Sequence, residues 1–245
     1  MNASEPISPT ALPLHGHSIA SQRWSELLFV HWRVDAEVVA PLLPPGLRPD
    51  THDGSSWVGL IPFLLDRATL FGSPPAPYIG RFVEVNVRLY AVDAAGRRGV
   101  VFRSLEASRI LAVLAAKAAF SLPYFWARTR LQLDGSDYAA SAARFGGGPT
   151  TRIRARIGAP VVSTPLDEFL TARWGMFVPR GGRTLFVPNE HPPWQLHAAE
   201  LLELDDELLA AGGLPGLAHT PPDSVRFAPG LVTRFGRPSK QFADG

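Results

Sequence analysis

Short stretches in which apolar and polar residues alternate follow one another along this chain of 245 residues. A β-strand places successive side chains on opposite faces, so each stretch predicts a strand with one apolar face. The stretches come in hairpin-like runs and do not alternate one by one with helices. This order argues against a doubly wound parallel sheet and favours an antiparallel sheet or barrel. We expect about nine or ten strands and three or four short helices.

Turn residues and breaks in the periodicity set the expected boundaries. Strands are predicted at residues 26–34, 56–65, 82–91, 100–107, 127–135, 137–145 and 151–158, twice within 183–204, and at 224–236. Helices are predicted at residues 35–46, 108–119, 164–175 and 205–214. Pro62 lies inside the second strand and predicts an edge or a bulge, because proline cannot donate a hydrogen bond to a neighbouring strand.

The strand at 82–91 has the most informative pattern. Its sequence, FVEVNVRLYA, places the valines and Leu89 on one face and an acid, an amide and a cation on the other. Successive residues of one face lie about 7 Å apart, which is the reach of a small polar ligand. The residues of the polar face are Phe82, Glu84, Asn86, Arg88 and Tyr90. From periodicity alone two interpretations stay open: this face lines a cavity, or it lies at the surface and forms ion pairs with the strand that carries Ser104 and Glu106.

The composition limits the kinds of site that the chain can form. It has 46% hydrophobic residues, enough for a large core, and no cysteine, which excludes disulfides, cysteine nucleophiles and zinc–thiolate sites. The formal charge is +2 and the basic residues are scattered, so no nucleic-acid partner is expected. Glu190 and His191 stand at a proline-rich corner, but no cluster of further ligands accompanies them, so no metal is expected. Glycine motifs that bind phosphate are also absent, and we expect no cofactor.

The N-terminal residues 1–20 lack the basic and apolar regions of a signal peptide and are predicted to form a flexible tail. The most apolar stretch, 110–127, is interrupted by Pro123, which leaves too few residues to span a bilayer. We therefore expect a cytoplasmic protein without a membrane partner, in which residues 21–245 form a single domain. A homo-oligomer is compatible with the sequence.

Lys117 lies on an apolar stripe of the predicted helix at 108–119, with Leu114, Val113 and Ile110 at helical spacing. A lysine in an apolar pocket has a lowered pKa and can form a Schiff base with a ketone. The alternative is a lysine whose stem lies along the helix while its ammonium group reaches water. This alternative is favoured because it needs no special architecture.

Several stretches, in the same order, resemble a family of uncharacterised bacterial proteins, the YqjF-like proteins. They are HWRVDAEVVAPLLPPGLRPDTHDGSSWVGLIPF, FVEVNVRLY, GVVFRSLEASR followed by AFSLPYFWA, FLTARWG and VPNEHPPWQLHAAEL, and the resemblance covers roughly residues 22–238. That family is placed in the acetoacetate decarboxylase-like superfamily. The resemblance therefore implies an α+β, β-rich domain, built as a cone-like antiparallel β barrel with flanking helices, whose lumen holds the site.

The resemblance also bears on single residues. In acetoacetate decarboxylase a glutamate on a barrel strand points inward, and a lysine that follows a Phe-Pro pair forms a Schiff base. Glu84 is similar to that glutamate, so the polar face of strand 82–91 is expected to face the lumen and the valines to pack under outer helices. The stretch that matches the lysine is Leu122-Pro123-Tyr124, in which tyrosine takes the place of lysine. The implied fold is unaffected by this difference, but Schiff-base decarboxylation is no longer expected.

We therefore predict that the lumen binds a small organic acid or carbonyl compound. Arg88 is expected to anchor a carboxylate or carbonyl oxygen, Glu84 to act as general acid or base, and Tyr124 to donate a hydrogen bond. The other candidate ligand-binding residues are Asn86, Glu106, Tyr90, His191 and Trp194. Whether the protein also converts the compound, in a lyase- or hydrolase-like reaction, stays open.

The alternative is a structural module without activity, in which Glu84 and Arg88 pair with each other and satisfy the buried polar face. The size of the lumen distinguishes the two predictions. A lumen of roughly 300 Å³ or more beside Glu84 favours ligand binding, whereas a filled lumen favours the structural module.

Overall fold

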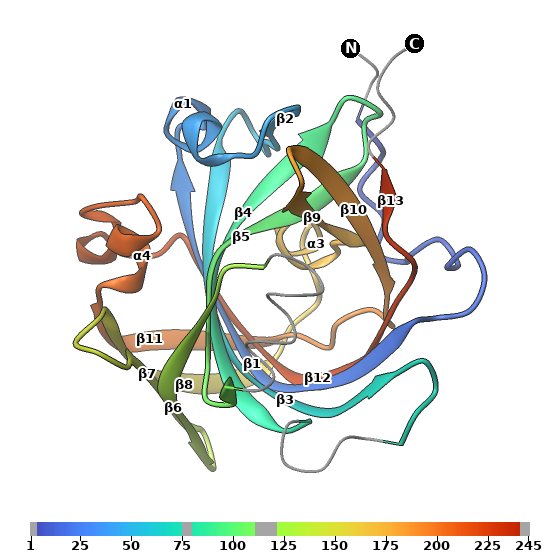
Figure 1. Ribbon diagram of the computed structural model, residues 1–245. Helices are drawn as coiled ribbons and strands as arrows, with labels where there is room; N and C mark the ends of the chain where they lie inside the picture. Colours follow the sequence, from blue (N-terminus) through green and yellow to red (C-terminus); the bar gives the residue numbers. More distant parts are fainter. Residues whose placement is uncertain (1–3, 75–79, 111–121, 241–245) are drawn as a thin grey trace.

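The computed structural model describes residues 4–74, 80–110 and 122–240, and its strands form one 13-stranded sheet (Figure 1). Strands β1 to β6 span Ala20–Val34, Leu47–Pro49, Ser56–Leu70, Phe82–Asp93, Arg98–Ala107 and Tyr124–Asp134. Strands β7 to β13 span Asp137–Arg144, Thr150–Pro160, Gly175–Arg180, Arg183–Glu190, His197–Asp206, Ser224–Phe235 and Ser239–Lys240. The prediction of a β-rich barrel is confirmed. All the predicted strands are present, together with β2, β9 and β13, which were not predicted.

Hydrogen-bonded neighbours close two rings within this sheet. One ring has nine strands, in the order β5-β6-β7-β8-β11-β12-β1-β3-β4, and β4 pairs back with β5. A second ring has seven strands, because β5 also pairs with β9, β9 with β10, and β10 with β12. The two rings share β12, β1, β3, β4 and β5, which form a wall between them. In Figure 1, β7, β8 and β11 of the nine-strand ring lie to the left, and β9 and β10 to the right.

The central part of the shared wall is buried on both faces. In β1, Leu28 and Val30 belong to one buried cluster, whereas the alternate residues Leu27 and Phe29 belong to another. The first cluster fills the nine-strand ring and the second surrounds the interior of the seven-strand ring. Strands with two buried faces have almost continuous apolar sequences, as in ELLFV of β1 and WVGLIPFLL of β3.

Strand β4 divides its side chains between the rings as the alternation predicts. Val85, Val87 and Leu89 lie in the cluster that fills the nine-strand ring. That cluster includes Tyr138 of β7 and Ile153 of β8. The valine face therefore packs against a second layer of strands, whereas the resemblance led us to expect outer helices.

The sheet is mixed, so the expectation of a wholly antiparallel barrel was wrong. Strand β5 runs parallel to β6 over Leu105–Ala107 and parallel to β9 at Val100. Parallel neighbours cannot be joined by a tight hairpin and need a longer crossover. The chain between Ala107 and Tyr124 is long enough to supply that crossover between β5 and β6. The remaining strand pairs are antiparallel.

A bulge between β1 and β3 confirms the irregularity that Pro62 predicted. The register of the two strands shifts between Ser25 and Val30, where Glu26 has a positive φ of 55°. Tyr138, on the opposite side of the nine-strand ring, contacts two backbone carbonyl groups at the bulge. The hydroxyl group of Tyr138 donates to the carbonyl oxygen of Glu26 at 3.0 Å and lies 3.2 Å from that of Pro62. The bulge is therefore built into the packing of the two layers.

The described helices are shorter than predicted. They are α1 (Ala36–Val39), α3 (Pro165–Thr171) and α4 (Leu208–Ala211), with 3-10 turns at Ala40–Leu42 and Leu217–His219. Helix α3 begins with a capping box, because Thr164 and Asp167 bind each other's backbone amides. None of the helices in the described residues is long and apolar enough to cross a membrane. Lys117 and most of the helix predicted at 108–119 lie outside the described residues.

Residues 4–19, part of the predicted flexible tail, have no regular secondary structure but contact the sheet. The amide of Glu5 donates to the carbonyl oxygen of Gly96 in the β4–β5 turn at 2.8 Å. The indole of Trp174 donates to the carbonyl oxygen of Ser8 at 3.0 Å. The segment therefore lies along the seven-strand ring.

Gly230 gives a test of the shared wall. Its φ is +131°, and a Cβ atom there would lie 2.2 Å from the carbonyl oxygen of Trp24 on β1. We expect Gly230→Ala to destabilise the protein by about 3 kcal/mol or more, because strain and a backbone clash act together. Urea denaturation measures the loss.

The matched control is Gly135→Ala, in the β6–β7 turn. Gly135 also has a positive φ, +57°, but no atom lies within 4 Å of the added Cβ. Only the backbone penalty of about 1 kcal/mol is expected there. Equal losses for the two variants would contradict the close contact between β1 and β12.

Candidate functional site

The seven-strand ring encloses a cavity of about 180 Å³. Apolar side chains of β1, β3 and β5 form most of its lining. Its titratable and amide side chains include Glu84, Asn86, Arg88, Tyr124, Arg173 and His191. The volume is below the roughly 300 Å³ typical of drug-sized ligands, but the lumen is not filled. Its size suits a compound with few non-hydrogen atoms.

Glu84 forms the acidic end of the polar face of β4 and is 3% exposed. The hydroxyl group of Tyr124 donates to its Oε2 at 2.8 Å, and Nδ2 of Asn86 lies 3.4 Å from its Oε1. Burial raises the pKa of Glu84 to about 7, although these two hydrogen bonds act in the opposite direction. The carboxyl group therefore exists in both protonation states near neutral pH. Burial also holds the pKa of Tyr124 well above its usual value, so its hydroxyl group stays protonated.

Arg88 forms the cationic end of the same face. Its Nε donates to the hydroxyl oxygen of Tyr90 at 2.9 Å, and its Nη2 donates to the carbonyl oxygen of Leu170 at 3.0 Å. Its guanidinium carbon lies 5.4 Å from the ring centre of Phe29. Within the described residues, Arg88 takes part in no ion pair. The guanidinium group therefore reaches the cavity with neutral partners around it.

Tyr90 lies behind Arg88 and does not line the cavity. It is fully buried, and its hydroxyl group contacts Nε2 of His31 at 2.6 Å and the carbonyl oxygen of Leu170 at 3.0 Å. Burial, and then the charges of Arg88 and Arg173, hold the pKa of His31 well below its usual value. Tyr90 thus holds Arg88 in place, although we predicted direct contact with a ligand.

The structure does not bring Glu106 to this cavity, which corrects its predicted position. Glu106 is opposite Val85 in the β4–β5 register, and directly paired residues share a face of the sheet. It therefore lies on the valine face. There Arg144 of β7 donates to it from Nε at 2.9 Å and from Nη2 at 2.7 Å. Glu106 and Arg144 form a two-point ion pair inside the nine-strand ring.

His191 and Trp194, two of the candidate ligand-binding residues, line the cavity. Nδ1 of His191 donates to the carbonyl oxygen of Pro192 at 2.7 Å, so in the neutral ring Nε2 is the acceptor. Burial lowers the pKa of His191 to about 4, and the ring is neutral at pH 7. The indole of Trp194 donates to the carbonyl oxygen of Thr171 at 3.1 Å, which ties this corner to the end of α3.

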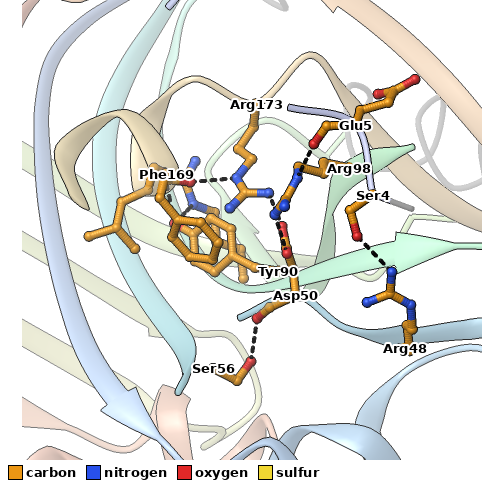
Figure 2. Close-up of polar contacts among 11 residues, drawn as sticks. Ser4, Glu5, Arg48, Asp50, Ser56, Tyr90, Arg98, Phe169 and Arg173 are labelled. Atoms are coloured by element: carbon orange, nitrogen blue, oxygen red, sulfur yellow. Dashed lines mark hydrogen bonds and ion pairs between the residues drawn. The ribbon is translucent and has the colours of Figure 1, made fainter. Parts of the chain in front are cut away.

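Arg173 also lines the cavity and was not predicted. Figure 2 shows its contact with Asp50. It follows α3 within the stretch FLTARWG, is 5% exposed, and forms an ion pair with Asp50. Its Nε donates to the carbonyl oxygen of Phe169 at 2.6 Å. No local pattern marks this residue as part of a site, because Asp50 lies far away in the chain and a single arginine after a helix is typical of a surface.

The described residues offer no metal site, since no three histidine or acidic side chains are grouped to hold an ion. They also place no lysine in the cavity lining. Lys240 lies in β13, and Lys117 lies outside the described residues. The chemistry that the described lining can supply is therefore that of a carboxyl group with a pKa near 7, two guanidinium groups and neutral hydrogen-bonding groups.

Comparison with known proteins identifies relatives of the chain. A family model described as an uncharacterized conserved protein, DUF2071, matches residues 21–232. The uncharacterized protein YqjF of Bacillus subtilis (strain 168) is 33% identical over 186 residues, which are 74% of this chain and 76% of that protein.

Solved structures share the fold at lower identity. An acetoacetate decarboxylase-like enzyme from Sphingomonas wittichii RW1 has a TM-score of 0.64 at 16% identity, over 92% of this chain and 93% of that one. The enduracididine biosynthesis enzyme MppR, solved in complex with pyruvate, has a TM-score of 0.64 at 15% identity, over 99% and 98%. The fold is therefore acetoacetate decarboxylase-like, as the resemblance implied.

The raised pKa of Glu84 predicts a pH dependence of stability. The folded carboxyl group holds its proton more tightly than the unfolded one, so the wild type loses stability as the pH rises from about 4.5 to about 7. In Glu84→Gln this loss is absent. The difference in unfolding free energy between variant and wild type should therefore shift in favour of the variant by about 2 to 3 kcal/mol between pH 5 and pH 8.

Urea denaturation of both proteins at the two pH values measures this shift. His191 acts in the opposite direction, because its lowered pKa makes the folded state gain stability as the pH rises from about 4 to about 6.5. The comparison with Glu84→Gln removes that contribution, since His191 is present in both proteins. A difference between the two proteins that does not change with pH would show that Glu84 titrates normally.

Proposed function

The chain belongs to the DUF2071 family of uncharacterized conserved proteins, and we propose that it binds a small organic acid or carbonyl compound in the cavity of the seven-strand ring. The observation that carries this proposal is the position of Arg88 at the cavity with neutral partners among the described residues. A guanidinium group does not lose its proton in a protein, so burial leaves it charged. A carboxylate or carbonyl oxygen of a ligand is the group that matches it.

Glu84 and Tyr124 supply the second half of the proposed site. A carboxyl group with a pKa of about 7 can both give and take a proton near neutral pH, which suits general acid–base catalysis. Tyr124 orients it through the 2.8 Å hydrogen bond and can turn its hydroxyl group towards a ligand oxygen. In this proposal Arg88 holds the acid group of the compound, and Glu84 exchanges a proton with its other end. Asn86, His191 and Trp194 contact the compound from the remaining sides.

The separation of Glu84 and Arg88 argues against the structural module. Four residues apart on one strand, their Cα atoms lie about 13 Å from each other. The described structure has no ion pair between them, and each binds different neutral groups. A small compound between them would meet a proton donor at one end and a cation at the other. The complex of MppR with pyruvate, a 2-oxo acid, supports the choice of 2-oxo acids as probes.

Loss of the guanidinium group should abolish binding. We expect small 2-oxo and hydroxy acids at millimolar concentration to raise the melting temperature of the wild type by several degrees, because a ligand that binds only the folded state stabilises it. The shift should vanish in Arg88→Met.

Arg103→Met is the matched control. Among the described residues, Arg103 donates hydrogen bonds to the carbonyl groups of Gly212 and Leu42 and does not line the cavity. It should respond like the wild type. If no acid stabilises the wild type, or if Arg88→Met responds as well as the control, the proposed function is wrong.

We also propose that the site works without a Schiff base. Tyr124 occupies the position that the resemblance gives to the lysine, and its hydroxyl group is engaged with Glu84. Incubation with acetoacetate followed by borohydride should therefore leave the mass of the protein unchanged. Mass spectrometry makes the measurement, with an authentic acetoacetate decarboxylase as positive control. A reduced adduct on Lys117 would overturn this part of the proposal and restore the decarboxylase mechanism.

A further inference from the structure

Arg173 is a second buried cation at the cavity, and its hydrogen bonding is incomplete. Nε binds the carbonyl oxygen of Phe169, and Nη1 binds Asp50. Nη2 is buried and has no hydrogen-bond partner among the described residues. A buried donor without a partner is unfavourable by about 1 to 3 kcal/mol, so this nitrogen is a place where an acceptor would be bound.

The charge of Arg173 is compensated only in part. Asp50 is its single acidic partner in the described structure, and Asp50 also pairs with Arg98 from β5 (Figure 2). One carboxylate thus serves two guanidinium groups. Taken together, these three side chains carry one net positive charge.

Arg173 and Arg88 lie close to one another. Their guanidinium carbons are 4.7 Å and 5.4 Å from the centre of the same ring, that of Tyr90. Both side chains also line the same cavity. The chain therefore presents two guanidinium groups to one small volume. Its histidine there, His191, is neutral at pH 7.

We propose that the compound bound in this cavity is a small dicarboxylate, with one carboxylate on Arg88 and the other on Nη2 of Arg173. The inference rests on the proposed function and narrows its ligand to one class. Arg88 adds a second net positive charge to the one that Arg98, Arg173 and Asp50 carry together. A dianion balances these two charges, whereas a monocarboxylate would leave one of them uncompensated. Carboxylate oxygens are also the strongest acceptors available to the free Nη2 donors.

Matched acids of equal chain length test the proposal by calorimetry at pH 7. Succinate should bind the wild type about tenfold more tightly than butanoate, and malonate more tightly than propanoate, because each gains a second charge-assisted contact. In Arg173→Gln this preference should fall to within about twofold. Arg103→Gln, which alters an arginine outside the cavity, should keep the preference of the wild type.

The outcomes separate this inference from the proposed function. Equal affinities of the wild type for succinate and butanoate, or a preference retained in Arg173→Gln, would overturn the dicarboxylate assignment and leave the proposed function standing. Absence of binding by all four acids and by 2-oxo acids would overturn both. If Arg173→Gln does not fold, succinate is compared with its monomethyl ester on the wild type. An ester that binds as tightly as succinate then refutes the second contact.

Discussion

Burial of β4 on both faces is the constraint on which the rest of the structure depends. The strand lies between β3 and β5 in a wall shared by two rings, so neither of its faces can turn to water. Its valine face is satisfied by packing alone. Packing alone does not satisfy its polar face, because a buried polar group without a hydrogen-bond partner is unfavourable. The cavity of the seven-strand ring lies where that polar face needs partners.

The two ends of the polar face respond to burial in opposite ways. Glu84 can become neutral, and burial raises its pKa to about 7. A guanidinium group keeps its charge in a protein. That of Arg88 binds the hydroxyl group of Tyr90 and a carbonyl oxygen. One physical cause therefore produces a weak acid and a fixed cation on one strand. In the proposed function this difference orients the ligand.

The sequence was most informative where a side chain's position depends only on strand parity. The alternation of 82–91 grouped Glu84, Asn86 and Arg88 on one face, and the resemblance placed that face towards the lumen, where all three line the cavity. Register between strands cannot be obtained from parity. An extra residue in β5 shifts its pairing with β4 between Val87 and Arg88, and Glu106 is opposite a valine. The parallel pairing of β5 with β6 was also not predicted, because the periodicity of apolar residues does not indicate the direction of a strand.

Arg173 shows why part of the cavity lining could be found only from the structure. Its acidic partner Asp50 is 123 residues away, and the aromatic rings of Tyr90 and Phe169 lie 4.7 Å and 4.2 Å from its guanidinium carbon. These contacts let the fold keep a cation beside an apolar cavity, because the rings and the acid replace part of its hydration. The rings and the acid do not replace all of the hydration, since Asp50 also pairs with Arg98 and Nη2 of Arg173 has no hydrogen-bond partner among the described residues. An arginine whose charge and donors were all paired within the protein could not bind a ligand. A buried arginine with no partners would destabilise the barrel. Arg173 is partly paired, and this partial pairing suits a ligand-binding residue.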